Sequence, residues 1–214
     1  MKRILILFAA VVLPLCISAQ TAGLFGASQA SNKKATDYSA YMEGSVPEVD
    51  GQIVFSKTIN ASGKSKADIY KALAAWASAR YMAEVENGKW NEAAYFRNLQ
   101  YSKVVKADSQ TGLIECQGNE EQVFSNKILS KDYTVIDYVL TISIAEGKAT
   151  ATMHNIAYTY DFQLDRERRP AEQVITDTQV FSKSGKWIKQ NRKFRIKTID
   201  LANELFHEIE QTIQ

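Results

Sequence analysis

The chain has 214 residues, of which 45% are hydrophobic and 23% are charged, and this composition is typical of one globular domain with short extensions. Its three prolines and ten glycines exclude a fibre rich in proline and glycine. Two of the 26 basic residues, Lys2 and Arg3, lie near the N-terminus, and those that remain balance the 24 acidic residues. A chain without net charge does not attract polyanions in bulk, so we expect no nucleic-acid partner.

The first 19 residues have the pattern of a signal peptide. A basic start is followed by an apolar run over residues 4–15, which is too short to span a bilayer, and then by Ser18 and Ala19, which are small residues before a cut. We therefore expect an exported protein of the periplasm or cell surface. The alternative is a lipid anchor on Cys16, which the bulky leucine before it disfavours. No later stretch is apolar enough to span a bilayer.

The remaining chain divides into a tether and one folded domain. Residues 20–45 are rich in Ala, Ser, Gly and Thr without a sustained period, which predicts a flexible tether in which Tyr38 and Tyr41 could dock locally. The folded domain is expected over residues 46–214. Alternating apolar residues predict its first strand over residues 51–59.

A helix and four strands are predicted next. Ser65 with Asp68 three residues later resembles a capping box, and the helix that starts there is expected to run to about Glu84. One face of this helix carries apolar residues at helical spacing, namely Ile69, Leu73, Trp76 and Ala77. Alternation of apolar and polar residues then predicts strands over residues 95–105, 113–118, 132–144 and 149–162.

The last two strands and the final helix give the clearest patterns. Six alternate residues of one strand share a face, namely Thr134, Ile136, Tyr138, Leu140, Ile142 and Ile144. Its partner strand changes face near His154 and Asn155, which predicts a β-bulge. A long helix is expected to start between Gly185 and Ile199. Its apolar stripe consists of Thr198, Leu201, Ala202, Leu205, Phe206 and Ile209.

The order of strand, helix, four antiparallel strands and helix predicts an α+β domain, with one antiparallel sheet and two helices packed on one of its faces. This order looks like the half-repeat of the fold of the TATA-binding protein (the TBP-like fold), and also like a reduced helix-grip fold. Three segments, residues 46–57, 175–177 and 193–200, together resemble a family of exported Bacteroidetes domains of unknown function with a TBP-like fold. The resemblance covers residues 46–214. It implies a fold and a compartment, but neither an activity nor DNA binding, because a fold does not carry a function.

The sequence predicts no catalytic residue, metal site or cofactor. His154 and His207 lack a paired cysteine and the spacing of metal ligands. We interpret Glu120 and Glu121 as solvated charges, and Cys116, which lies in an apolar stretch, as a buried and inert thiol. We therefore expect a protein that is not an enzyme. The alternative is a small carboxylate-dependent hydrolase, which would need two acids within about 5–10 Å of each other in one pocket.

Two groups of residues are candidates for contact with a ligand or partner. Residues 183–197 form a basic segment with interleaved apolar residues, and its candidates are Trp187, Lys189, Arg192, Lys193 and Arg195. The second group consists of tyrosines that could lie on an open sheet face, namely Tyr101, Tyr158 and Tyr160.

These candidates suggest a binding or interaction module of the cell envelope. Its partner would be an envelope protein, a glycan or a lipid head group. In the plainer alternative, the basic segment is a solvated face whose apolar residues dock on the sheet while its lysine and arginine stems lie along the edge. In a third hypothesis, the protein is an assembly part that pairs through an exposed sheet edge.

Overall fold

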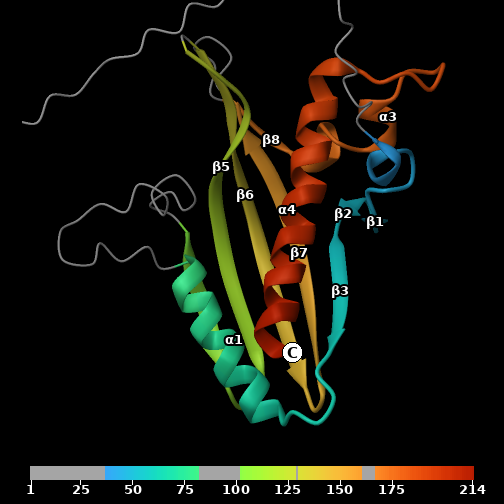
Figure 1. Ribbon diagram of the computed structural model, residues 1–214. Coiled ribbons are helices and arrows are strands. Elements are labelled where there is room, and N and C mark those ends of the chain that lie inside the picture. The colour runs from blue at the N-terminus through green and yellow to red at the C-terminus, as the bar shows by residue number, and fades with distance from the viewer. Residues whose placement is uncertain (1–36, 82–101, 129, 161–166) are drawn as a thin grey trace, which may run out of the picture. The chain divides into compact units, whose positions relative to one another are not determined.

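The computed structural model describes residues 37–81, 102–128, 130–160 and 167–214, and in this part a six-stranded sheet is antiparallel throughout (Figure 1). Five of the strands follow one another across the sheet in the order β3 (Phe55–Asn60), β7 (Lys148–Thr159), β6 (Ser130–Ala145), β5 (Leu113–Lys127) and β4 (Lys103–Asp108). The sixth strand, β8 (Arg168–Pro170), pairs with the end of β7. Two short strands, β1 (Glu48–Val49) and β2 (Gln52–Ile53), pair only with each other.

Both long helices lie on the same face of the sheet (Figure 1). α1 (Lys66–Tyr81) packs on β4, β5 and β6, and α4 (Lys189–Ile213) packs on β3, β5 and β7 as well as on α1. Three short helical segments complete the described part, namely η1 (Ser39–Tyr41), η3 (Ala171–Gln173) and α3 (Asp177–Val180). The predicted α+β architecture is therefore confirmed.

The core lies between the sheet and the two helices. The six alternate residues of β6 from Thr134 to Ile144 are all buried, and so is the predicted stripe of α4 from Thr198 to Ile209. Each fully buried Ile or Leu side chain contributes about 1.5–3 kcal/mol relative to exposure, so the two patterns together fix which faces meet. Cys116 is buried in this core, and its burial raises the pKa of its thiol to about 12, so the thiol is protonated at neutral pH as expected.

Several local predictions are confirmed by the geometry. The Ser65 hydroxyl accepts a hydrogen bond from the Asp68 backbone N–H (3.1 Å) and donates one to the Asp68 carboxylate (2.7 Å), which forms the expected cap before α1. Asn155 has a φ of 54°, and the register between β6 and β7 shifts there, so the predicted bulge is present. The predicted end of the first helix near Glu84 lies outside the described residues, and so do residues 95–101 of the strand predicted over residues 95–105.

Two boundaries differ from the prediction. β5 continues beyond Gly118 to Lys127, because its polar residues pair along β6 and a second register shift lies between Val123 and Ser125. Residues 37–45, which the prediction assigned to the tether, belong to the same compact unit as the sheet. Among the described residues, no helix is long and apolar enough to cross a membrane.

Candidate functional site

The open face of the sheet, opposite the helices, carries short polar side chains that pair with each other. Ser56 is hydrogen bonded to Thr152 (3.1 Å between the hydroxyl oxygens), and Thr58 to Thr150 (3.0 Å). Thr141 and His154 make a similar pair across β6 and β7, 3.1 Å apart. The described tyrosine candidates do not lie on this face. The contact surface therefore has to be sought elsewhere.

Tyr158 is turned toward the helices and is buried. Its hydroxyl lies 2.6 Å from the Thr198 hydroxyl, and its ring centroid lies 5.1 Å from that of Phe194 on α4. Burial raises the pKa of Tyr158 above its ordinary value. The prediction that Tyr158 contacts a ligand is thus corrected, because the residue is part of the core. Tyr101 lies outside the described residues.

Tyr160 and Lys193 meet in one cluster that joins α4 to the β5–β6 hairpin. The Lys193 ammonium donates hydrogen bonds to Asp132 Oδ2 (2.8 Å) and to the Tyr160 hydroxyl (2.7 Å). It also lies 4.4 Å from the ring centroids of both Phe124 and Tyr160. Burial disfavours the charge of Asp132, but hydrogen bonds from Lys193 and Tyr160 outweigh it and lower the pKa of Asp132. This cluster fixes the hairpin against the start of α4.

Arg195 is completely buried, so the prediction that places it on a contact surface is corrected. Its guanidinium donates hydrogen bonds to the backbone carbonyls of Tyr41 (2.8 Å), Met42 (2.7 Å) and Ile175 (2.8 Å). Asp177 Oδ1 lies 2.7 Å from Nη2 as an ion pair without hydrogen-bond alignment. Arg195 therefore helps to hold residues 37–45 against α4, together with the hydrogen bonds of Tyr41 to Asp200 (2.7 Å) and of Gly44 to Asp177 (2.9 Å).

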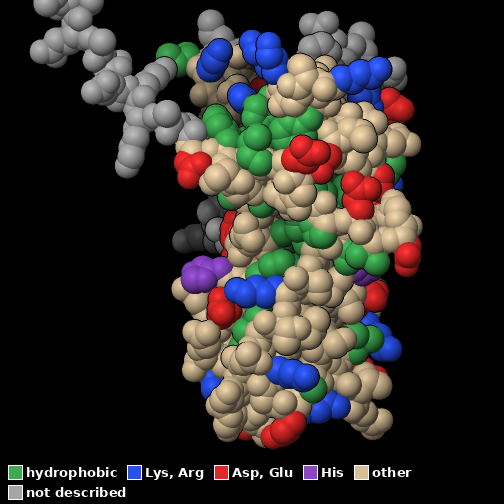
Figure 2. Space-filling view, turned by 90° about the vertical axis from the view of Figure 1, so that its right-hand side faces the viewer, with side chains coloured by type: hydrophobic (Ala, Val, Ile, Leu, Met, Phe, Trp, Pro, Cys, Tyr) green, Lys and Arg blue, Asp and Glu red, His purple; other side chains and the backbone are tan. Residues whose placement is uncertain are grey.

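Trp187 forms an aromatic cluster with Tyr38 and Phe181 beside the start of α4, and Arg192 lies over the Tyr38 ring. The Trp187 ring centroid lies 4.6 Å from that of Phe181 and 6.2 Å from that of Tyr38, and the Arg192 guanidinium carbon lies 5.2 Å from the Tyr38 centroid. Figure 2 shows hydrophobic side chains gathered in the upper part of this side, with Lys and Arg side chains above them. The plainer prediction, in which the apolar residues of the basic segment dock on the sheet, fits Phe194, whose ring packs on Tyr158 and Phe124. Trp187 packs instead on Phe181 and Tyr38, and Ile188 and Lys189 are exposed.

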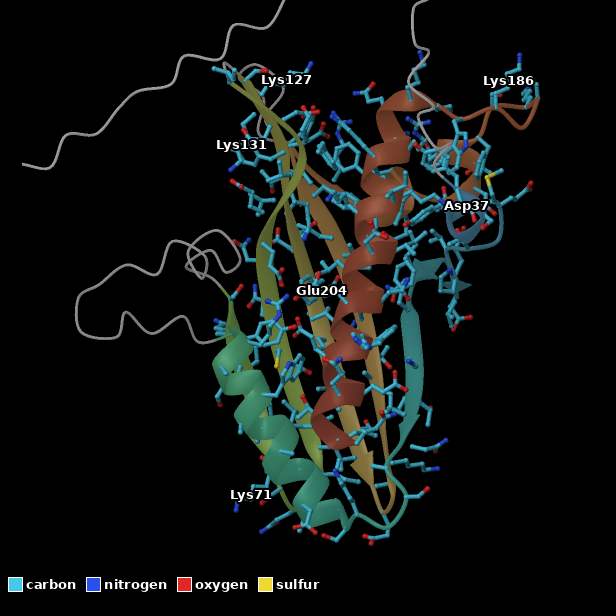
Figure 3. The ribbon with its side chains drawn as sticks, in the orientation of Figure 1. Asp37, Lys71, Lys127, Lys131, Lys186 and Glu204 are labelled. Atoms are coloured by element: carbon cyan, nitrogen blue, oxygen red, sulfur yellow. The ribbon has the colours of Figure 1, made fainter. Side chains whose placement is uncertain are left out.

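Two segments that are distant in sequence place lysines at the same end of the molecule. Figure 3 shows Lys127 and Lys131 at the tip of the β5–β6 hairpin and Lys186 in the turn before α4, all at the upper end. Each segment also exposes an isoleucine, since Ile128 is fully exposed and Ile188 is 38% exposed. We call this surface the basic end and define it by the following residues: Lys127, Ile128, Lys131, Lys183, Lys186, Ile188 and Lys189.

A buried network of charged and polar side chains under α1 was missed by the sequence analysis. Arg80 and Glu120 form an ion pair (3.0 Å) in which both side chains are 4% exposed, so the interpretation of Glu120 as a solvated charge is wrong. Tyr138 donates a hydrogen bond to Glu120, and its hydroxyl lies 3.0 Å from that of Tyr81. Burial raises the pKa of Glu120, although Arg80 and Tyr138 oppose this shift. Burial also raises the pKa of Tyr138 and Tyr81 far above the ordinary value.

A groove between the two long helices lies directly above this network. Its cavity has a volume of about 370 Å³ and is lined by Trp76, Ala79, Arg80, Glu208, Gln211 and Thr212. We call it the α1–α4 groove. The Trp76 indole N–H donates a hydrogen bond to Glu208 Oε2 (3.1 Å), and Arg80 Nε lies 3.4 Å from the same oxygen. No local sequence pattern identified it, because α1 and the end of α4 are more than 100 residues apart.

The carboxylates of Glu120 and Glu208 meet the distance condition for a carboxylate-dependent hydrolase, but they do not share one pocket. Both contact the guanidinium of Arg80, so they are at most about 9 Å apart. Only Glu208 lines the groove, however, and Glu120 lies behind Arg80 in the core. The pair therefore does not form two acids that face one substrate. Among the described residues, no group of three His, Cys, Asp or Glu side chains could hold a metal ion.

The described edge of the sheet at β4 is protected against pairing. Lys103 and Lys106 are exposed there, and the register with β5 shifts between Val104 and Lys106. Lysines and irregular register are the features that keep an edge strand from joining another sheet. This observation disfavours the hypothesis of assembly through that edge.

These features define an α+β domain of the TBP-like class. A family model described as "Domain of unknown function (DUF4468) with TBP-like fold" matches residues 55–159. A DUF4468 family protein from Bacteroides ovatus has 32% sequence identity and a TM-score of 0.69, over 83% of this chain and 95% of that one. The chain therefore belongs to the DUF4468 family.

A more distant solved structure shows the fold alone. A TBP-like protein from Parabacteroides distasonis has 22% identity and a TM-score of 0.59, over 79% of this chain and 97% of that one. No curated protein is similar to the chain. The predicted family resemblance and TBP-like fold are confirmed by these comparisons.

Proposed function

We propose that this protein is an exported, non-enzymatic binding module of the cell envelope, and that its basic end docks on an anionic lipid surface. The observation that carries the proposal is that two projecting segments combine exposed isoleucines with lysines at one end of the molecule (Figure 3). Side chains of this kind suit the boundary between lipid head groups and acyl chains.

The two segments reach beyond the body of the fold in the same direction. The contact between Lys193 on α4 and Phe124 on β5 places these two residues at the same height along the molecule. From that level β5 continues to Ile128, which adds roughly 13 Å of strand. Helix α4 extends back from Lys193 to Lys189, which adds roughly 6 Å of helix. The hairpin tip would therefore insert first, and the turn before α4 would rest on the head groups.

The charge of the basic end is sufficient for measurable but reversible binding. Lys131 is paired with Glu121, so the excess positive charge comes from Lys127, Lys183, Lys186 and Lys189. A lysine near an anionic surface contributes about 1 kcal/mol, and four of them contribute about 4 kcal/mol. Insertion of Ile128 would add about 1.5–3 kcal/mol. The lysines and the isoleucine together would then contribute a binding free energy that corresponds to dissociation constants of about 0.01–0.1 mM.

The test is co-sedimentation of the chain from Gln20 onward with lipid vesicles. We expect binding to vesicles that contain about a third phosphatidylglycerol, and little binding to phosphatidylcholine alone. The double variant Lys127→Glu/Lys186→Glu should lose most of this binding. The matched control is Lys71→Glu, which reverses an exposed lysine on α1 at the opposite end (Figure 3).

Three results would overturn the proposal of a lipid-docking end. These are absence of binding to anionic vesicles, equal losses in the double variant and the Lys71 control, or stronger binding to a soluble acidic polysaccharide than to the vesicles. Export is tested separately, by expression of the full chain with its leader and fractionation of the cells. A product that keeps its first 19 residues in the cytosol would contradict export.

A further inference from the structure

The α1–α4 groove has a wall that is fixed before any ligand arrives. The indole of Trp76 is held against α4 by its hydrogen bond to Glu208, and its ring packs edge-on against Tyr81 at 6.1 Å between centroids. The Thr212 hydroxyl donates to the Glu208 backbone carbonyl (2.7 Å), so this hydroxyl is already used within the helix. The Glu208 carboxylate, whose Oε2 accepts the Trp76 N–H, and the Gln211 amide also line the groove.

Among the described charges at this groove, one arginine faces three carboxylates, those of Glu120, Glu204 and Glu208. The positive charge of Arg80 is offset by Glu120 behind it, because these two side chains form a buried ion pair. Glu208 is 25% exposed and faces the cavity. Glu204 is exposed one helical turn earlier, on the side of α4 that faces α1 (Figure 3), and its charge also acts on Glu120.

We propose that the α1–α4 groove binds a small organic cation that carries an ammonium group, through the Trp76 indole and the Glu208 carboxylate. Tryptophan is the aromatic side chain that attracts cations most strongly, and a partly desolvated carboxylate attracts a positive charge more strongly than one in bulk water. The groove has a volume of about 370 Å³ and is largely open to solvent, so a small amine or an amino sugar can enter it and stay partly hydrated. A neutral sugar would also stack on the indole, but it gains nothing from the excess negative charge.

The buried network supports this site by holding its carboxylate in place. Arg80 contacts Glu208 at one end and Glu120 at the other, and Tyr138 and Tyr81 hold Glu120 from below. A buried ion pair is seldom the most stable choice for a core, since apolar residues of the same volume often serve as well. Its presence here is explained if it fixes a binding group at the surface, because preorganisation reduces the cost of binding.

The test is isothermal titration of the chain from Gln20 onward with choline, ethanolamine and glucose as probes. We expect the two cations to bind and to bind more weakly at high salt, whereas glucose does not bind. Glu208→Gln should weaken cation binding by about tenfold or more, since it removes the charge and keeps the shape. The matched control is Glu210→Gln, which removes an acid of the same helical turn that pairs instead with Lys57 on β3.

A second variant keeps the inference testable if the Glu208 variant does not fold. Gln211 is exposed on α4, so Gln211→Lys should fold and place a positive charge at the opening of the groove. We expect it to abolish cation binding and to leave vesicle binding by the basic end unchanged. The inference is overturned if neither cation binds at millimolar concentration, if Glu208→Gln and Glu210→Gln bind equally, or if glucose binds in preference to the cations. It does not depend on the proposed lipid docking.

Discussion

Replacement of Arg195 by leucine tests the role that the structure gives to the most deeply buried charge on α4. In the native protein, its guanidinium donates to three backbone carbonyls and to the Ser45 hydroxyl (3.0 Å), and it pairs with Asp177. Leucine keeps an apolar stem but supplies no donor. The variant would leave these acceptors and one carboxylate without their partner in a partly buried site.

The expected loss of stability is large but not complete. Removal of one member of a buried ion pair costs about 3–5 kcal/mol, and this range already includes the acceptors that are left without donors. A domain of this size has a free energy of unfolding of about 5–15 kcal/mol, so the variant should still fold at low temperature. Because Arg195 binds the carbonyls of Tyr41 and Met42, residues 37–45 should detach before the sheet unfolds.

Urea unfolding followed by circular dichroism measures the free energy, and limited proteolysis measures the release of residues 37–45. Arg192→Ala is the control, because Arg192 lies over the Tyr38 ring at the surface and its loss should cost about 0.5–1 kcal/mol. A loss below about 1 kcal/mol for Arg195→Leu, or equal protection of residues 37–45 in both variants, would refute the structural role of Arg195. It would return this residue to the set of contact candidates.

Three further predictions concern the core. The Cys116 thiol, whose pKa burial raises to about 12, should react with a disulfide reagent far more slowly in the folded chain from Gln20 onward than after unfolding in urea. Burial raises the pKa of Glu120 above its ordinary value of 4.5. At a pH between the unfolded and the folded pKa, the folded state holds a proton that the unfolded state has lost, so the free energy of unfolding should fall as the pH rises between these two values. Urea unfolding at several pH values from about 4 to 7 should show this slope in the native protein and lose it in Glu120→Gln. Gly118→Ala should lower the free energy of unfolding by about 1–3 kcal/mol or more, as thermal unfolding can measure, since the added Cβ would lie 2.1 Å from the Tyr138 ring.

The parts of the fold that the sequence predicts are those with a local repeating pattern. The alternation along β6 and the stripe of α4 require only that each residue be apolar on the side that meets the core, so periodicity identifies them. The cap formed by Ser65 and Asp68 lies within four residues, and it is equally visible in the sequence. The bulge at Asn155 was predicted because the apolar face of the strand changes there.

The features that the sequence does not predict depend on partners far along the chain. Glu120 pairs with Arg80, which is 40 residues away, and Arg195 binds carbonyls about 150 residues away. Charged residues are mostly exposed, so sequence reasoning places such residues at the surface by default. Residues 37–45 have the composition of a tether, and their order comes from contacts with distant residues such as Arg195, Asp177 and Asp200 rather than from an apolar pattern of their own.

The rest of the fold explains why Arg195 is buried, but it does not explain why Arg80 is buried. Arg195 donates to the backbone carbonyls of Tyr41, Met42 and Ile175, so its burial is accounted for by the docking of residues 37–45. Arg80 pairs instead with a carboxylate whose own charge needs neutralising, and apolar residues could fill the same volume without either charge. Natural sequences tend to break the rules of core packing where a site requires it. The contact of Arg80 with Glu208, which lines the α1–α4 groove, supplies such a reason and directs the search for a ligand there.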